Sequence, residues 1–183
     1  GHEALSWCII MPRSGPAPLT QRAGFLRRNF QQPTYLGYVA LTRIFLGVHY
    51  LIVGWPKVMG MTGETLAAQL SRTAAGDPLP FHREFITGFV IPNAGAFSSL
   101  VAYGEVAIGL SFLVGCLVRV SAVFGVFNNL NILLAIAIPT GGGQVPINLY
   151  FITAEIVFIV AAAGRSLGLD GLLKRAFPRS PLF

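Results

Sequence analysis

The chain has 183 residues, of which 54% are hydrophobic and only 11% are charged, and its mean hydropathy is +0.66. A chain of this size buries too little surface in water to hide so much apolar material, so the composition excludes an ordinary soluble domain and predicts lipid as the solvent. The net charge of +6 does not indicate nucleic-acid binding, because the basic residues stand between apolar runs and at both ends rather than on one continuous face.

The first 35 residues form a basic arm that is rich in Pro and Gly. Its apolar run at 8–11 is too short for a signal peptide and is followed directly by Pro12. The composition predicts an arm that is either disordered by itself or lies along the membrane or a partner subunit.

Four apolar stretches are long enough to cross a bilayer core, which takes roughly 20 residues. They cover residues 36–55, 97–118, 120–138 and 147–163. The first is expected to end at Pro56, and the second and third meet in a tight turn at Arg119. The sequence therefore predicts an all-α fold, an integral membrane four-helix bundle at residues 36–175, with a short tail at 176–183.

Basic residues beside the apolar stretches predict the orientation of the bundle, since Lys and Arg accumulate on the cytoplasmic side of a membrane. Most of them flank the side that carries both termini. The opposite side has only Lys57, Arg72 and Arg83, which Glu64, Asp77 and Glu84 balance. Both termini are therefore predicted to be cytoplasmic.

The single sizeable loop between the stretches, residues 57–95, is predicted on the extracytoplasmic side. Residues 63–75 are expected to form a short helix, which the Pro-rich segment 77–80 ends. A second amphipathic or re-entrant piece follows at 81–91. Its apolar side chains that can face lipid are Phe81, Phe85, Ile86 and Phe89.

Ionisable side chains inside a bilayer are costly, so each one is a functional hypothesis. The expected spans contain Arg43, His49, Glu105 and Glu155, and the third adds the amides Asn128, Asn129 and Asn131. At a rise of about 1.5 Å per residue these groups fall at comparable depths, because the long Arg43 side chain can reach toward the others. We expect an inward-facing cluster of Arg43, Glu105 and Glu155, with Asn128 and His49 nearby.

Three roles are open for this cluster. It can be structural, with a buried arginine neutralised by carboxylates and with amides bonding across helices. It can bind a quinone headgroup or relay protons, since both need buried acid–base groups within reach of lipid. Alternatively, His49 can be an axial ligand of haem or of a chlorophyll-type pigment. The sequence offers no Cys/His spacing for a metal site and no nucleophile arrangement for catalysis.

Glycines mark the expected helix contacts. Gly47 and Gly54 share a helix stripe with Arg43, and Gly109 lies one turn after Glu105. Small residues at such spacing let another helix approach closely. We therefore expect close packing at these glycines.

Three segments carry a recurring pattern. Segment 43–57 has an early Arg and ends in Gly-aromatic-x-Lys, segment 104–119 begins with Gly-Glu and ends in Gly-x-x-x-Arg, and segment 164–170 reads Gly-Arg-x-x-x-Leu-Asp. In this order and spacing they resemble the DoxX family of small four-helix bacterial membrane proteins, over residues 36–175. The positions that match the family pattern are Arg43, Lys57, Glu105, Arg119, Arg165 and Asp170.

The resemblance implies a multi-pass protein of the bacterial cytoplasmic membrane. Because the family includes a subunit of thiosulfate:quinone oxidoreductase, it also implies a link to quinone. The expected function is an accessory subunit of a membrane redox complex that contacts lipids, and partner subunits through the 1–35 arm and the 57–95 loop. The alternatives are a quinone-binding oxidoreductase subunit of the thiosulfate:quinone type, and a pigment- or lipid-contacting scaffold of a photosynthetic complex.

Overall fold

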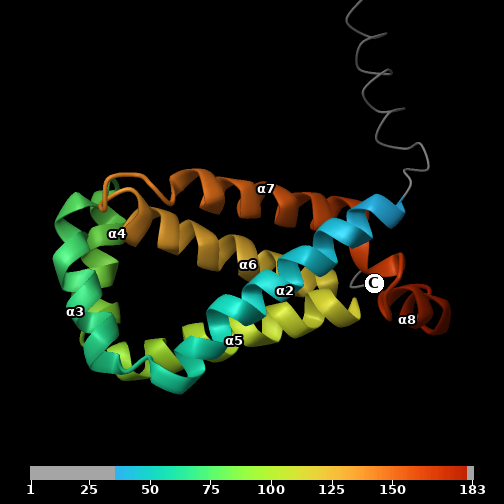
Figure 1. The fold of residues 1–183 in the computed structure, drawn as a ribbon, viewed down its shortest axis with the longest axis horizontal. Helices are drawn as coiled ribbons and strands as arrows, with labels where there is room; N and C mark the ends of the chain where they lie inside the picture. The colour runs from blue at the N-terminus through green and yellow to red at the C-terminus, as the bar shows by residue number, and fades with distance from the viewer. Residues whose placement is uncertain (1–35, 181–183) are drawn as a thin grey trace, which may run out of the picture. The chain divides into compact units, whose positions relative to one another are not determined.

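The computed structural model describes residues 36–180, and the regular elements in this range are helices. Those of the bundle are α2 (Leu36–Gly60), α5 (Ala94–Val114), α6 (Val118–Ile132) and α7 (Val145–Ala161). Helix α2 packs beside α5, and α6 packs beside α7 (Figure 1). The predicted all-α fold is therefore confirmed for the described residues, whereas the predicted arm at 1–35 lies outside them.

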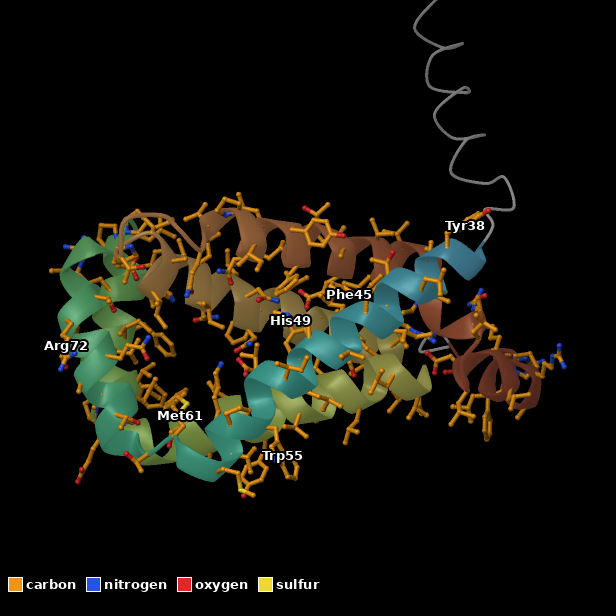
Figure 2. All side chains as sticks on the ribbon, viewed as in Figure 1. Tyr38, Phe45, His49, Trp55, Met61 and Arg72 are labelled. Carbon is orange, nitrogen blue, oxygen red and sulfur yellow. The ribbon has the colours of Figure 1, made fainter. Side chains whose placement is uncertain are left out.

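Three helical segments are long and apolar enough to cross a membrane. They are Gly37–Gly60, Ala94–Val114 and Val118–Ala137, the last combining α6 with the π-helical turn Leu133–Ala137. Large apolar side chains such as Phe45, Trp55 and Phe124 are exposed on these segments, and Trp55 projects outward from α2 (Figure 2). A surface of this kind requires lipid contact, so the chain is a membrane protein. Helix α7 is also apolar but has 17 residues, and its predicted crossing stays a prediction.

The first helix was expected to end at Pro56, but it runs through this residue to Gly60. Proline removes only its own N–H donor and the bond to one carbonyl, and membrane helices tolerate this loss in their interior. The additional turn brings Lys57 onto the inner side of α2, where it reaches a carboxylate of α5.

The hairpin between α5 and α6 turns slightly earlier than predicted, because α5 ends at Val114 and is capped by Gly115 rather than continuing toward Arg119. Gly115 has φ of +70°, a left-handed conformation that favours glycine. A Cβ atom at this position would lie 2.5 Å from Nη1 of Arg43, so glycine is required there for space as well as for backbone conformation.

The loop between α2 and α5 packs onto one end of the bundle, which we call the loop end. It contains α3 (Gly63–Thr73), the 3₁₀ turn Ala74–Gly76, α4 (Pro80–Phe85) and the π-helical turn Ile86–Val90. Its own apolar cluster comprises Leu66, Leu70, Ala74, Ile86, Val90, Ala94 and Ala135. The short helix predicted at 63–75 is therefore present, and its apolar side is buried against the bundle.

Of the four apolar side chains in the second loop piece that are expected to be able to face lipid, three are exposed and one is buried. Phe81, Phe85 and Phe89 are exposed, but Ile86 is buried in the loop-end cluster. The reason is helical spacing, because Ile86 lies four residues after the buried His82 and four before the buried Val90. The three phenylalanines are also four residues apart and share the outward face.

The opposite end of the bundle, where α2 begins and α5 ends, is called the base. Here α7 leads into the 3₁₀ turn Ala163–Arg165 and then into α8 (Asp170–Ala176), a short helix that the sequence pattern did not indicate. Figure 1 shows α8 at the base, away from α3 and α4. A second apolar cluster, which includes Leu46, Phe112 and Phe158, fills the interior of the bundle next to the base.

The predicted close approach at glycines is confirmed between α2 and α5. A Cβ atom on Gly47 would lie 2.9 Å from the backbone nitrogen of Leu113, and one on Gly109 would lie 3.0 Å from the Gly47 oxygen. A Cβ atom on Gly54 would likewise lie 3.0 Å from the Cβ atom of Glu105. Contacts this close exclude a larger side chain without movement of the helices.

Candidate functional site

Hydrogen bonds divide the five predicted site residues among separate groups instead of one cluster. Arg43 lies at the base, Glu105 and Asn128 lie together between α2, α5 and α6, and Glu155 lies in a third group between α2, α6 and α7. The ring of His49 packs on Phe151 of α7, with 4.6 Å between the ring centroids. Only Glu105 and Asn128 among these five are joined by a direct hydrogen bond.

Arg43 is completely buried, and it binds backbone carbonyls rather than the predicted carboxylates. Its Nη1 atom donates to the carbonyl of Ala163 at 2.9 Å and to that of Ser166 at 3.3 Å, and Nη2 donates to the carbonyl of Leu167 at 2.8 Å. A guanidinium group has several donors in a rigid fork and suits several acceptors at once. Arg43 therefore fixes the turn after α7 against the start of α2.

Asp170 fixes the same end of the bundle through contacts with the start of α6. Its two carboxylate oxygens accept from the backbone N–H groups of Leu117 and Val118, at 2.7 and 3.0 Å. Those donors belong to the first turn of α6, where N–H groups have no partner within the helix and a negative charge is favourable. The Asp170 N–H also donates to the Gly115 carbonyl at 2.9 Å. The start of α8 thus caps α6.

Three residues other than glycine have left-handed backbone conformations at the base. Leu117, Ala162 and Leu167 have φ values of 55°, 49° and 49°. Each such residue costs about 1–2 kcal/mol unless its surroundings impose the conformation. Here each one is next to, or takes part in, a hydrogen bond of Arg43 or Asp170. The two buried charges therefore hold a strained connection.

Glu105 forms the second group with Lys57 and Asn128. Lys57 Nζ lies 2.5 and 2.7 Å from the two carboxylate oxygens, and the Asn128 amide donates to Oε1 at 3.3 Å. The Glu105 side chain is only 3% exposed, but that of Lys57 is 28% exposed. Asn128 is half-buried as well. This group combines a buried carboxylate with two N–H donors that are accessible in part.

Glu155 forms the third group with Tyr50 and Asn129, and this group is closed. The Tyr50 hydroxyl donates to Glu155 at 2.6 Å, and the Asn129 amide donates to both carboxylate oxygens at 3.1 and 3.2 Å. Glu155 has no exposed surface, and the other two side chains are also buried. Gly125 provides the space, since a Cβ atom there would overlap the Glu155 carboxylate. A fully satisfied buried network of this kind ties three helices together.

A further polar group lies at the loop end, where no site was predicted. The ring of His82 on α4 is held between the Asp77 carboxylate and the Asn131 side-chain oxygen, the latter at 3.1 Å. Asp77 also accepts from the Leu79 N–H at 2.9 Å, and Arg83 donates to the Asp77 carbonyl at 2.6 Å. Both Asp77 and His82 are buried. The group fastens the loop to α6 through Asn131.

Four of the residues in these groups are not among the site residues expected from the sequence, although Lys57 matches the family pattern. Tyr50 was not considered because it lies within an apolar run, and Lys57 was expected beyond the end of the first helix. Asp77 and His82 were assigned to a loop, whose contact with the third span has no local signal. In the part of the chain that the structure describes, no three His, Cys, Asp or Glu side chains are placed to hold a metal ion.

The DoxX family model matches residues 38–138, more than half of the chain. The chain belongs to the DoxX family. No curated protein and no solved structure matches it. The DoxX match contains Lys57, Glu105 and Asn128 in full, but it ends before Glu155 and before segment 164–170. The group of Lys57, Glu105 and Asn128 is therefore built entirely from the region that matches the DoxX family model.

Proposed function

We propose that this DoxX protein is an accessory subunit of a quinone-linked electron-transfer complex in the bacterial cytoplasmic membrane, and that Lys57, Glu105 and Asn128 contact the quinone headgroup. The observation that carries the proposal is the difference between the two carboxylates inside the bundle. Glu155 is enclosed by its partners, whereas Glu105 is paired with donors that keep part of their surface accessible.

The chemistry of a quinone suits this group. Its two carbonyl oxygens accept hydrogen bonds, and Lys57 and Asn128 present N–H donors beside a buried carboxylate. Oxidation of a quinol releases two electrons and two protons, and its reduction takes both up again. In this proposal Glu105 accepts or returns a proton at a carboxylate oxygen. The electrons would pass to or from a redox group on a partner subunit, which is why an accessory role is proposed rather than a complete enzyme.

The proposal includes a membrane arrangement with four crossings and cytoplasmic termini. Helix α7 has 17 residues, which at about 1.5 Å per residue gives roughly 25 Å, close to the thickness of a bilayer core. Among the described residues outside the bundle interior, the base carries five basic residues and the loop end three, and this asymmetry favours the base on the cytoplasmic side. Those at the base are Arg119, Arg165, Lys174, Arg175 and Arg179, and those at the loop end are Lys57, Arg72 and Arg83. The quinone would then reach Glu105 from within the membrane.

The quinone site is tested by extracting and quantifying quinone from protein that has been purified in mild detergent from its native membrane. Glu105→Gln and Lys57→Met are compared with the wild-type chain, with Glu64→Gln as a matched control on the exposed surface of α3. Loss of a hydrogen bond to a charged group corresponds to a decrease of at least about tenfold in quinone affinity. Unchanged quinone content in both bundle variants, with normal folding, would remove this site.

The accessory role is tested on the same preparation by native electrophoresis with mass spectrometry of the band. We expect the protein in a larger complex whose other subunits carry redox groups. A protein that migrates alone, or only with copies of itself, contradicts the accessory role even if quinone is bound. In that case thiosulfate-dependent reduction of quinone is the activity to measure next.

A further inference from the structure

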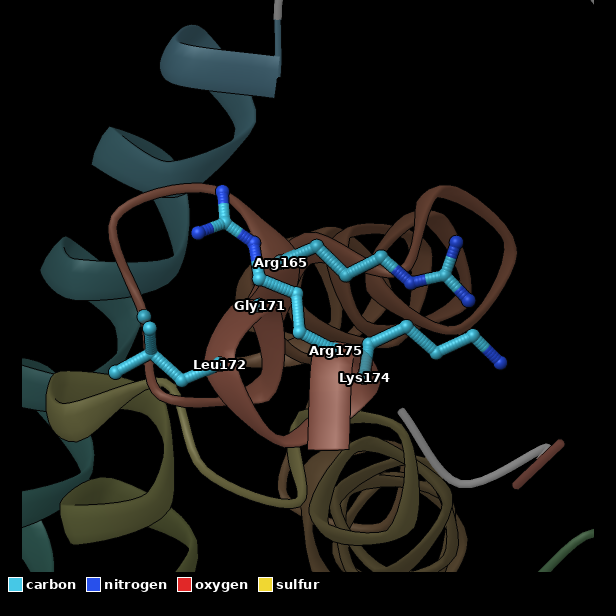
Figure 3. A pocket seen from close by; sticks show the side chains of 6 residues that line it. Arg165, Gly171, Leu172, Lys174 and Arg175 are labelled. Carbon is cyan, nitrogen blue, oxygen red and sulfur yellow. The ribbon is translucent and has the colours of Figure 1, made fainter. Parts of the chain in front are cut away.

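The turn after α7 and the helix α8 line an open pocket at the base of the bundle. Three of its side chains are cationic, and the lining consists of Arg165, Gly168, Gly171, Leu172, Lys174 and Arg175 (Figure 3). The pocket has a volume of about 330 Å³, which is within the range of small-ligand sites. A phosphate group with its adjoining ester atoms fits the size and the charge.

Exposed apolar side chains occur in the same segment as the pocket lining. Leu172, which lines it, is 60% exposed, and Leu167 on the preceding turn is 70% exposed. Leu169 and Phe177 are exposed as well. Four large apolar side chains within one short segment are unfavourable in water. At a membrane surface they would enter the acyl region, while Lys and Arg side chains remain at the level of the headgroups.

The pocket is rigidly attached to the membrane-spanning helices. Arg43 holds the turn that contributes Arg165 and Gly168, and Asp170 anchors the start of α8 to the first turn of α6. Asp170 is the only acidic residue between 163 and 180. Since it is 2% exposed and already accepts from two backbone N–H groups, it does not face the pocket as a competing anion.

We propose that this pocket binds the phosphate of an anionic phospholipid in the leaflet that surrounds the base of the bundle. Arginine donors match phosphate oxygens in a forked geometry, and each cation near the surface adds attraction to an anionic headgroup. The exposed Leu172 in the lining and the exposed apolar side chains of the same segment favour a lipid over a soluble anion, because they would enter the acyl region of the membrane. The proposal does not depend on the quinone site, which uses none of these residues.

The test is a lipid titration of the purified full chain in detergent, followed by native mass spectrometry. We expect phosphatidylglycerol to bind more tightly than phosphatidylcholine. Arg165→Gln, Lys174→Gln and Arg175→Gln should each weaken phosphatidylglycerol binding about fivefold, and the triple variant should weaken it on the order of a hundredfold. Arg179→Gln neutralises an exposed cation close in sequence but outside the pocket, and it should leave the affinity unchanged.

Several results would overturn the proposal. One is equal binding of the two lipids, and another is a triple variant that retains wild-type affinity for phosphatidylglycerol. An effect of Arg179→Gln as large as that of Arg165→Gln would indicate diffuse surface attraction instead of a site. Displacement of the lipid by inorganic phosphate at matched concentration would assign the pocket to free phosphate. If the triple variant fails to fold, as judged by its melting temperature, the three single variants carry the comparison.

Discussion

Lys57 Nζ lies within 2.7 Å of both carboxylate oxygens of Glu105, and this ion pair connects the last turn of α2 with the middle of α5. The two partners differ in their access to solvent, because Lys57 keeps part of its surface exposed while Glu105 does not. Removal of Lys57 and removal of Glu105 therefore have different consequences. A lysine left alone can turn toward water or the membrane surface, but a glutamate left alone keeps a buried charge.

We expect Lys57→Met to destabilise the protein more than Glu105→Gln. An uncompensated buried charge costs about 3–5 kcal/mol, whereas loss of a partly exposed pair costs only about 1 kcal/mol. The double variant Lys57→Met with Glu105→Gln should be more stable than Lys57→Met alone, since the stranded charge is gone. Thermal unfolding in one detergent measures all three. Equal melting temperatures for the two single variants would contradict the asymmetry.

Arg43→Lys is expected to loosen the base while leaving the rest of the bundle folded. An ammonium group cannot reproduce the two-nitrogen fork that now reaches three carbonyls of the turn after α7. Each lost hydrogen bond from a charged donor costs about 1.5–3 kcal/mol. Amide hydrogen exchange in peptides from 163–172 should therefore accelerate by tenfold or more. Arg72→Lys, on the exposed surface of α3, is the control, and equal exchange in the two variants would reject this role.

The spans and their contacts were predictable to a large extent, because hydropathy and glycine spacing are local properties of a sequence. The approach of α5 to Gly47 and Gly54 was expected for that reason, and the structure has it. The partners of Arg43 were not predictable. Its carbonyl acceptors face it only because Ala162 and Leu167 adopt left-handed conformations, and neither residue type signals such a conformation.

The division of the polar residues into groups also depends on information that one helix does not contain. Glu105, Glu155 and Arg43 lie at comparable depths along their helices, and depth alone therefore predicts that they meet. The rotation of each helix about its axis decides which of them meet, and packing across the whole bundle sets this rotation. Tyr50 shows the same limit, since its hydroxyl is a donor within a run that otherwise reads as apolar.

Gly125→Ala should destabilise the bundle because the new methyl group would overlap the Glu155 carboxylate. Moving that carboxylate weakens its hydrogen bonds with Tyr50 and Asn129, and overpacking alone costs about 1–3 kcal/mol. The matched control is Gly104→Ala in α5, where a Cβ atom meets nothing within 4 Å. That variant should be as stable as the wild-type chain or gain up to about 1 kcal/mol from helix propensity. Similar melting temperatures for both alanine variants would show that Glu155 is not confined by its neighbours.

Asp77 provides a graded test of how the loop is fastened to α6. Asp77→Asn keeps an oxygen that accepts from the Leu79 N–H and an amide that faces His82, so it should cost only about 1 kcal/mol. Asp77→Ala removes both interactions and leaves the His82 ring nitrogen without its buried partner, at a cost of about 2–3 kcal/mol. We expect cleavage by a protease within 76–84 to increase from wild type through Asp77→Asn to Asp77→Ala, while Glu84→Ala, at an exposed position of the same loop, has no effect. If Asp77→Ala is as resistant as Glu84→Ala, apolar packing of Leu66, Leu70 and Ile86 holds the loop in place without the help of the Asp77 carboxylate.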